Sequence, residues 1–235
     1  MTALGIIPAR YYSSRLPGKP LLDILGKSMI QRVYEQAQKS MLERLIVGTD
    51  DQRIEQAVMD FGGEVMMTSN KHISGTDRCL EVMEKLEESY DVIVNIQGDE
   101  PFINPVQINQ LIHAFENPKT QIATLAKVID DKRLLSDSHT PKVSFNDHFW
   151  ATSFDRLLSF EEERTFYKHI GLYAYRPAIL KAICDLPPTK NELEQRLEQW
   201  RWLDHNYDIH VKITNLDAYA IDTNDDLKKV IQRFG

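Results

Sequence analysis

Residues 91–101 have the sequence Asp91-Val92-Ile93-Val94-Asn95-Ile96-Gln97-Gly98-Asp99-Glu100-Pro101. The first half is an almost unbroken apolar run rich in Val and Ile, which is typical of a strand buried on both faces in a parallel sheet covered by helices. Gly98 and Pro101 then end the strand and leave two carboxylates at its carboxyl end. Ligands bind at that end of open α/β sheets, so Asp99 is a candidate metal ligand. The alternative is a solvated acidic turn.

Short strands and helices alternate around this stretch, which predicts the α/β class with a mostly parallel, doubly wound sheet. Before it we expect strands at 3–8, 43–48 and 64–68, and helices at 28–40, from Asp51 to Gly62, and after Arg78. After it we expect helices at 105–115, 130–137, 177–184 and 191–205, and strands at 121–128, 169–176 and 209–213. A β-hairpin is expected at 143–154 and a solvated helix or loop at 160–165. Residues 218–227 are expected to form a strand that runs into a capped helix. Trp200 falls on the apolar stripe of the 191–205 helix and is interpreted as a core residue.

The composition limits the classes of function. The chain has 235 residues and a net charge of −7, so it suits one large domain and offers no basic face for nucleic acid. Two cysteines without CxxC spacing argue against a disulfide framework or a zinc site. The first residues form no signal peptide, and no apolar run is long enough to cross a bilayer. A cytoplasmic enzyme without a membrane partner is therefore expected.

A basic loop follows the first predicted strand. Arg10, Arg15 and Lys19 lie within residues 9–20, where Ser, Pro and Gly predict a loop. A loop in this place of an α/β unit is suited to hold phosphates, because Arg offers a planar fork and Lys a point charge. The alternative is a solvated basic loop. Gly26-Lys27-Ser28 is no P-loop, since Leu21 stands where the opening glycine should be, and no GxGxxG exists.

Two more positions suggest a ligand. Arg78 lies in the first turn of a predicted helix, where a cation opposes the helix dipole. Either an anionic ligand or the neighbouring Asp77 would explain it. Asp222 stands at a predicted strand end, as Asp99 does, and we expect the two carboxylates to meet in space.

Six motifs carry a family resemblance. They occupy residues 7–21, 74–78, 97–101, 169–176, 197–199 and 221–223, in that order. Together they make the chain resemble the 3-deoxy-manno-octulosonate cytidylyltransferases, the enzymes that make CMP-Kdo, over nearly its whole length. The resemblance implies a GT-A-like nucleotidyltransferase fold in a single domain, residues 1–235, with residues 140–176 as an excursion for the dimer contact and the sugar side. It also implies CTP and a sugar acid as substrates, Mg²⁺ as cofactor, a homodimer, and a role in lipopolysaccharide or capsule synthesis.

The resemblance also assigns site residues. Asp99 and Asp222 look like metal ligands, and with Lys19 and Arg15 they form the expected catalytic set. The nucleotide contacts implied are Ala9, Arg10, Ser14, Arg15, Lys19, Ser74, Arg78 and Gln97. The sugar-acid contacts implied are Gln97, Arg156, His169, Tyr173, Glu198 and Gln199. For His169 the alternative is a structural histidine in a strand.

The chain departs from the family pattern at several places. The segment 153–158 lacks the usual proline, the connection from it to His169 is short, 216–219 lacks glycines, and Trp200 replaces a typical Leu. These changes gather on the sugar side and around the dimer contact. The alternatives are therefore the same transfer to another acid, such as 8-amino-Kdo or a nonulosonate, and a non-catalytic nucleotide-sugar-binding module.

Overall fold

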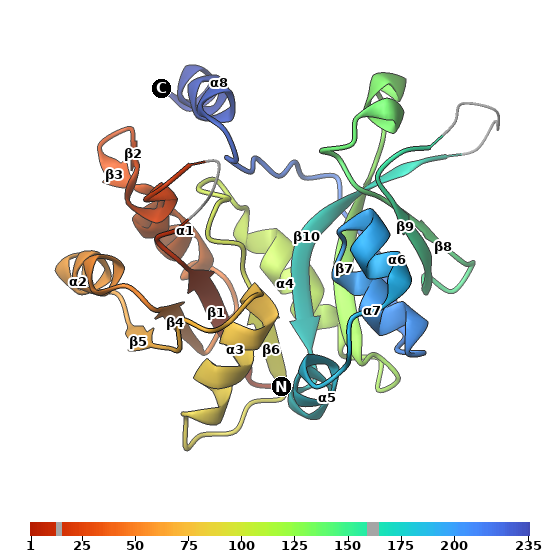
Figure 1. Ribbon diagram of the computed structural model, residues 1–235, viewed down its shortest axis with the longest axis horizontal. Helices are drawn as coiled ribbons and strands as arrows, with labels where there is room; N and C mark the ends of the chain where they lie inside the picture. The colour runs from red at the N-terminus through yellow and green to blue at the C-terminus, as the bar shows by residue number, and fades with distance from the viewer. Residues whose placement is uncertain (13–15, 159–164) are drawn as a thin grey trace. The chain divides into compact units, whose positions relative to one another are not determined.

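Residues 1–12, 16–158 and 165–235 are described by the computed structural model (Figure 1). They divide into two units, one made of Met1–Asn109 with Ala218–Gly235 and the other of Gln110–Asp217. Helix α4 (Pro105–Ala114) spans the division. The expected single domain with an excursion at 140–176 stays a prediction.

The first unit is built on a parallel sheet with the strand order β6-β1-β4-β5. Its central strand β1 (Ala3–Ala9) pairs in parallel with β4 (Arg44–Thr49) and β6 (Val92–Asn95), and β4 pairs with β5 (Val65–Met67). All four residues of β6 are buried, which confirms the expectation for this stretch. The alternating helices are α1 (Met29–Ala37), α2 (Gln52–Asp60) and α3 (Gly75–Glu84), and α3 packs against β1, β4 and β6.

Local sequence explains where these helices begin. Ser28 caps α1 and Asp51 caps α2 by accepting a backbone N–H with the side chain. Ser74 and Asp77 form a capping box at the start of α3. Asp51 follows β4 and Ser74 follows the loop after β5, so the N-termini of α2 and α3 lie at the carboxyl end of the parallel sheet. This is the edge at which α/β sheets bind ligands.

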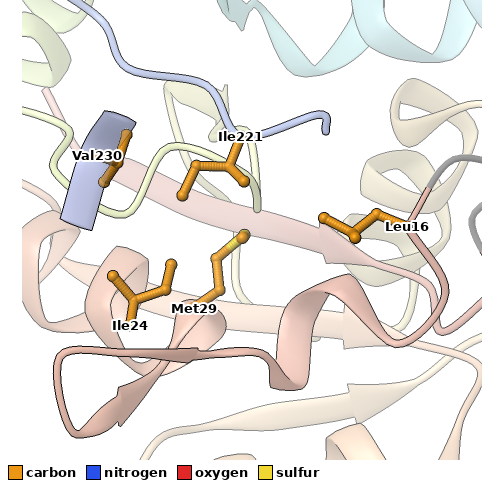
Figure 2. Packing of buried hydrophobic residues seen from close by; sticks show 5 residues of the cluster. All are labelled: Leu16, Ile24, Met29, Ile221 and Val230. Carbon is orange, nitrogen blue, oxygen red and sulfur yellow. The ribbon is translucent and has the colours of Figure 1, made fainter. Parts of the chain in front are cut away.

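The C-terminal segment packs onto the loops that follow β1. Ile221 and Val230 join Leu16, Ile24 and Met29 in a buried cluster, and Figure 2 shows the first two side chains facing those of Ile24 and Met29. Leu16 and Ile24 flank η1 (Lys19–Leu21), a short 3₁₀ helix, and the small hairpin β2 (Asp23–Ile24) and β3 (Lys27–Ser28) follows it.

The prediction of a strand at 218–222 is wrong. The backbone there is irregular. The N–H of Ile221 donates to the carbonyl of Asp99 at 2.9 Å and is not part of a β-ladder. The expected helix is confirmed as α8 (Asn224–Phe234), which begins at a capping box of Thr223 and Asp226. Packing of Ile221 and this one hydrogen bond therefore bring Asp222 beside Asp99 without a strand.

The second unit has a mixed sheet. Strand β7 (Ile122–Val128) lies between β11 (Ile209–Ile213), which is parallel to it, and β10 (Tyr167–Tyr175), which is antiparallel. The expected hairpin is confirmed as β8 (Lys142–Phe145) and β9 (Ala151–Asp155), and β8 pairs with β10. Helix α5 (Pro177–Cys184) has the predicted bounds, while η2 (Lys132–Ser136) is a 3₁₀ helix. The prediction for 160–165 falls, except for Thr165, outside the described residues.

The prediction of one long helix at 191–205 is wrong. Two short helices, α6 (Lys190–Gln195) and α7 (Gln199–Asp204), are separated at Arg196, whose φ of 53° is left-handed and ends α6. Trp200 is consequently only half-buried, and its Nε1 donates to the carbonyl of Phe154 at 2.6 Å. The core tryptophan is Trp202, which is 1% exposed.

Within the described residues, no helix combines the length and apolarity that a membrane crossing requires.

Candidate active site

A pocket of about 270 Å³ opens in the first unit at the carboxyl ends of β1 and β6. Its lining comes from the end of β1 and the loop after it, from η1, from the loop and first turn that begin α3, from the turn after β6, and from Asp222. Of the residues proposed from the sequence, it brings together Ala9, Arg10, Lys19, Ser74, Arg78, Gln97, Asp99 and Asp222. Ser14 and Arg15 lie outside the described residues.

Lys19 joins the two candidate metal ligands. Its Nζ donates to Oδ2 of Asp99 at 2.7 Å and to Oδ1 of Asp222 at 2.9 Å. The three side chains are 12%, 27% and 41% exposed, respectively. An oxygen from each carboxylate thus lies within hydrogen-bonding reach of one point, and that point holds a cation. The expected meeting of Asp99 and Asp222 is confirmed.

Two glycines set the backbone around this cluster. Gly18 has φ 70°, a left-handed conformation that glycine adopts at little cost, and it turns the chain so that η1 begins with Lys19. The N–H of Gly18 donates to the carbonyl of Tyr11 at 2.9 Å, which ties the start of η1 to the residue that follows Arg10. At Gly98 a Cβ would lie 3.2 Å from the carbonyl oxygen of Pro8, so the turn that carries Asp99 passes close against β1.

The partner of Arg78 differs from the one considered above. Its side chain is 4% exposed and donates to Asp50 at 3.2 Å and to the hydroxyl of Thr68. Asp77 instead belongs to the capping box with Ser74. Arg78 also lines the pocket, so it presents a buried cation there that the protein has fixed in place. The pairing with Asp50 explains how a cation is tolerated at a helix start.

The sequence interpretation missed His72 and Ile73, which line the pocket directly before the cap of α3. His72 Nε2 contacts a carboxylate oxygen of Glu81. A signal was available, because both residues stand in a loop between a strand and a helix on the ligand-binding edge of the sheet.

His169 lies in the second unit at the centre of a buried group. Its Nε2 is 2.8 Å from the hydroxyl of Thr124, and its ring lies 5.1 Å from that of Phe154 and 5.4 Å from that of Tyr173, centroid to centroid. A bulge in β10 between Ile170 and Tyr173 sets Tyr173 opposite Thr124. Burial lowers the pKa of His169 to about 3, so the ring is neutral at ordinary pH.

The other candidates for the sugar side lie in the same unit and have unequal surroundings. Burial, with the nearby Glu198 carboxylate, raises the pKa of the Tyr173 hydroxyl well above its usual value. Gln199 is 5% exposed, and its Nε2 is buried with no hydrogen-bond partner in the described part of the chain. Buried amides without a protein partner are rare, so Gln199 is a candidate contact for a polar ligand.

Arg156 is held by the backbone. Its Nε donates to the carbonyl of Gln195 at 2.6 Å, Nη1 to that of Ser138 at 2.8 Å, and Nη2 to that of Arg196 at 2.9 Å. These three bonds tie the break between α6 and α7 to the loop before β8. They leave two of the five guanidinium N–H groups for a ligand. The sugar-binding role of Arg156 stays a prediction.

The first unit therefore combines a parallel sheet, a pocket at its carboxyl edge, and basic side chains beside two carboxylates that share a cation. These features define a class of α/β proteins that bind a phosphorylated ligand at the carboxyl edge of the sheet.

Comparison with known proteins narrows this class. A family model described as Cytidylyltransferase matches residues 4–212. The chain is 50% identical to the 3-deoxy-manno-octulosonate cytidylyltransferase of Parabacteroides distasonis, over 98% of this chain and 97% of that protein. It is 49% identical to the one from Bacteroides thetaiotaomicron, over 97% and 96%. The chain belongs to the 3-deoxy-manno-octulosonate cytidylyltransferase family, and it is a nucleotidyltransferase.

Solved structures agree with this assignment. A CMP:2-keto-3-deoxy-manno-octonic acid synthetase complexed with CTP matches with a TM-score of 0.94 and 40% identity, over 99% of this chain and 98% of that one. A putative glucose-1-phosphate thymidylyltransferase from Bacillus anthracis, at 16% identity and a TM-score of 0.71, shows the shared fold alone. The resemblance, the fold class and the enzyme class expected from the sequence are thus confirmed.

Proposed function

We propose that this enzyme transfers CMP from CTP to 3-deoxy-manno-octulosonate (Kdo), for lipopolysaccharide or capsule synthesis. The anomeric hydroxyl of the sugar acid attacks the α-phosphorus of CTP, a new P–O bond forms, and the bond to the β-phosphate breaks to release pyrophosphate. The observation that carries this proposal is the Lys19–Asp99–Asp222 cluster in the pocket of a chain that is 40% identical to a synthetase complexed with CTP.

Positioning and charge neutralisation supply most of the catalysis in such a transfer. The triphosphate brings several negative charges to the pocket, where Lys19, Arg10 and Arg78 are the cations of the described lining. Arg10 is exposed and free to fork onto phosphate oxygens, whereas Arg78 is buried and fixed by Asp50. We assign Arg10 and Lys19 to the phosphates and Arg78 to the nucleoside end.

The two carboxylates fit a magnesium ion. Mg²⁺ prefers oxygen ligands and is usually held by one or two carboxylates together with substrate phosphates. In the described part of the chain, no three His, Cys, Asp or Glu side chains gather to form an all-protein metal site. Asp99 and Asp222 would therefore hold the ion jointly with CTP, and the ion would supply electrostatic stabilisation of the charge that builds on the phosphates. Lys19 holds the two carboxylates together and then donates to phosphate oxygens.

The sugar acid is assigned to polar residues of the second unit. The support comes from Gln199, whose buried Nε2 has no partner in the described residues, and from the buried hydroxyl of Tyr173. A carboxylate or hydroxyl of the sugar would satisfy such groups. Neutral His169 suits hydrogen bonding better than general acid–base catalysis, because its pKa is held near 3. We assign it a positioning role.

Pyrophosphate release with CTP and Kdo tests the proposal. We expect release that needs CTP, a divalent ion and the sugar acid together, and that stops with a chelator. Higher kcat/KM with 8-amino-Kdo or a nonulosonate would move the assignment to that acid. CTP binding without release for any acid would favour the non-catalytic module. The homodimer and the cytoplasmic location stay proposals, and light scattering of the purified enzyme tests the first.

A further inference from the structure

His72 stands in the nucleotide pocket and has no role in the account above. It lines the pocket beside Ile73 and the N-terminal turn of α3, which also provides Ser74 and Arg78. The proposed function assigns the phosphates to Arg10 and Lys19, and the metal ion to Asp99 and Asp222, in the same lining. A nucleotide with its triphosphate beside Lys19 would have the rest of the lining, which includes His72, available for its base.

Glu81 fixes the orientation of His72. This carboxylate, on α3, contacts His72 Nε2, accepts from the N–H of Ser69 at 2.8 Å, and pairs with Lys85 at 2.6 Å. Burial raises the pKa of Glu81, but the bonds from Lys85, Ser69 and His72 outweigh burial and hold that pKa at about 2. An ionised carboxylate only accepts hydrogen bonds, so Nε2 of His72 must carry the proton.

The protonated Nε2 determines what the other ring nitrogen can do. In a neutral imidazole with the proton on Nε2, Nδ1 is a hydrogen-bond acceptor. Among the described residues, Nε2 of His72 is bonded and Nδ1 has no protein partner. The side chain is 21% exposed and lies on the pocket lining. When the ring is neutral, His72 therefore has an acceptor atom, Nδ1, that no described residue occupies, in a side chain that lines the pocket.

We propose that His72 determines the specificity for cytosine, with Nδ1 accepting a hydrogen bond from the exocyclic amino group of the base. This inference rests on the proposed function and names the residue that reads the base. Cytosine carries an amino donor at the position where uracil carries a carbonyl acceptor. With UTP, the carbonyl oxygen of uracil and Nδ1 of His72 would both be acceptors, and no hydrogen bond could form between them. A site built around a hydrogen bond rejects an analogue that cannot make it.

The test measures dissociation constants of CTP and UTP by calorimetry, without sugar acid, for the wild type and for His72→Ala. His72→Phe is the second variant, because it keeps a ring of similar size but has no nitrogen. The matched control is His113→Ala, which removes a histidine that is 48% exposed and paired with Glu116 at 2.8 Å on α4. Circular dichroism and the melting temperature report folding of each variant.

We expect the loss of one hydrogen bond to raise the dissociation constant of CTP about tenfold in both His72 variants and that of UTP less than twofold. The preference for CTP over UTP therefore falls about tenfold, and His113→Ala keeps it. A purely structural role, in which His72 only anchors the loop to Glu81, would weaken both nucleotides equally. An unchanged preference in the His72 variants overturns the proposal. Failure of the proposed function would appear separately, as wild-type enzyme that releases no pyrophosphate from CTP with any acid.

Discussion

Removing the ammonium of Lys19 is the perturbation that the site geometry specifies most closely. Lys19→Met keeps the length of the side chain and leaves Asp99 and Asp222 facing each other without a cation. In the native protein Nζ lies 2.7 Å from one carboxylate and 2.9 Å from the other. We expect the variant to be less stable without metal and to regain that stability when a divalent ion takes the place of the ammonium.

The magnitude follows from the two bonds and their exposure. A hydrogen bond to a charged group contributes about 1.5–3 kcal/mol, and an exposed ion pair about 0.2–1 kcal/mol. Because the carboxylates are 27% and 41% exposed, solvent screens both bonds, and each contributes a free energy near the lower of these two ranges. We therefore expect Lys19→Met to lower the free energy of unfolding by about 2 kcal/mol, which lowers the melting temperature of a chain this long by about 4–8 °C.

The assay is thermal unfolding of wild type and variant, each in EDTA and in millimolar Mg²⁺ without nucleotide. Mg²⁺ should raise the melting temperature of Lys19→Met more than that of the wild type, because an ion that binds only the folded protein stabilises it. Lys27→Met is the control, since Lys27 pairs with Glu35 at 2.6 Å away from the pocket. Equal stability of Lys19→Met and wild type in EDTA, or the same effect of Mg²⁺ on both, would refute the reasoning.

Three further predictions concern turnover, the sugar side and pH. Asp99→Asn should reduce kcat at least a hundredfold with an unchanged circular dichroism spectrum, because it removes a charge from the ion site; near-normal kcat at saturating Mg²⁺ would contradict this. Gln199→Met should leave the urea midpoint unchanged or higher, since the buried Nε2 has no partner among the described residues, and raise the KM of the sugar acid about tenfold. His169 is neutral when folded, with its pKa lowered from 6.5 to about 3, so its contribution is present above pH 6.5 and is lost as the pH falls. In urea titrations, the free energy of unfolding of His169→Gln should therefore fall by about 2 kcal/mol less than that of the wild type between pH 7 and pH 5. The same fall in both proteins would exclude the effect.

The sequence was sufficient to predict the elements that local patterns determine. The buried strand at 92–95, the helices expected from Ser28 and from Asp51, and the hairpin expected at 143–154 are all present in the structure. Strand alternation placed Asp99 at the carboxyl edge, and the pocket is found there. These features depend on residues close in sequence, so periodicity and turn chemistry reveal them.

Contacts between distant residues were not predictable in the same way. The break at Arg196 is stabilised by Arg156, about forty residues away in the chain, whose guanidinium donates to the carbonyls of Gln195 and Arg196. The irregular segment before Asp222 is held by a bond to Asp99 and by packing of Ile221, neither of which leaves a periodic signal.

Partners were harder to predict than positions. Arg78 was placed correctly as a pocket residue, but its carboxylate is Asp50, at the end of another strand, and not the adjacent Asp77. His72 was missed because its only signal was its place in a loop at the ligand-binding edge of the sheet, with no motif or periodicity to mark it. Its significance comes from Glu81, nine residues later on α3.

The central claim is that Asp99 and Asp222 bind one divalent ion together with CTP. Its most direct test is the anomalous scattering of Mn²⁺ in crystals grown with CTP. We expect a Mn²⁺ peak in contact with a carboxylate oxygen of each aspartate and with a phosphate oxygen, and Nζ of Lys19 moved from the carboxylates to the phosphates. A Mn²⁺ ion bound to phosphate oxygens alone, with Lys19 still between the two aspartates, would contradict it.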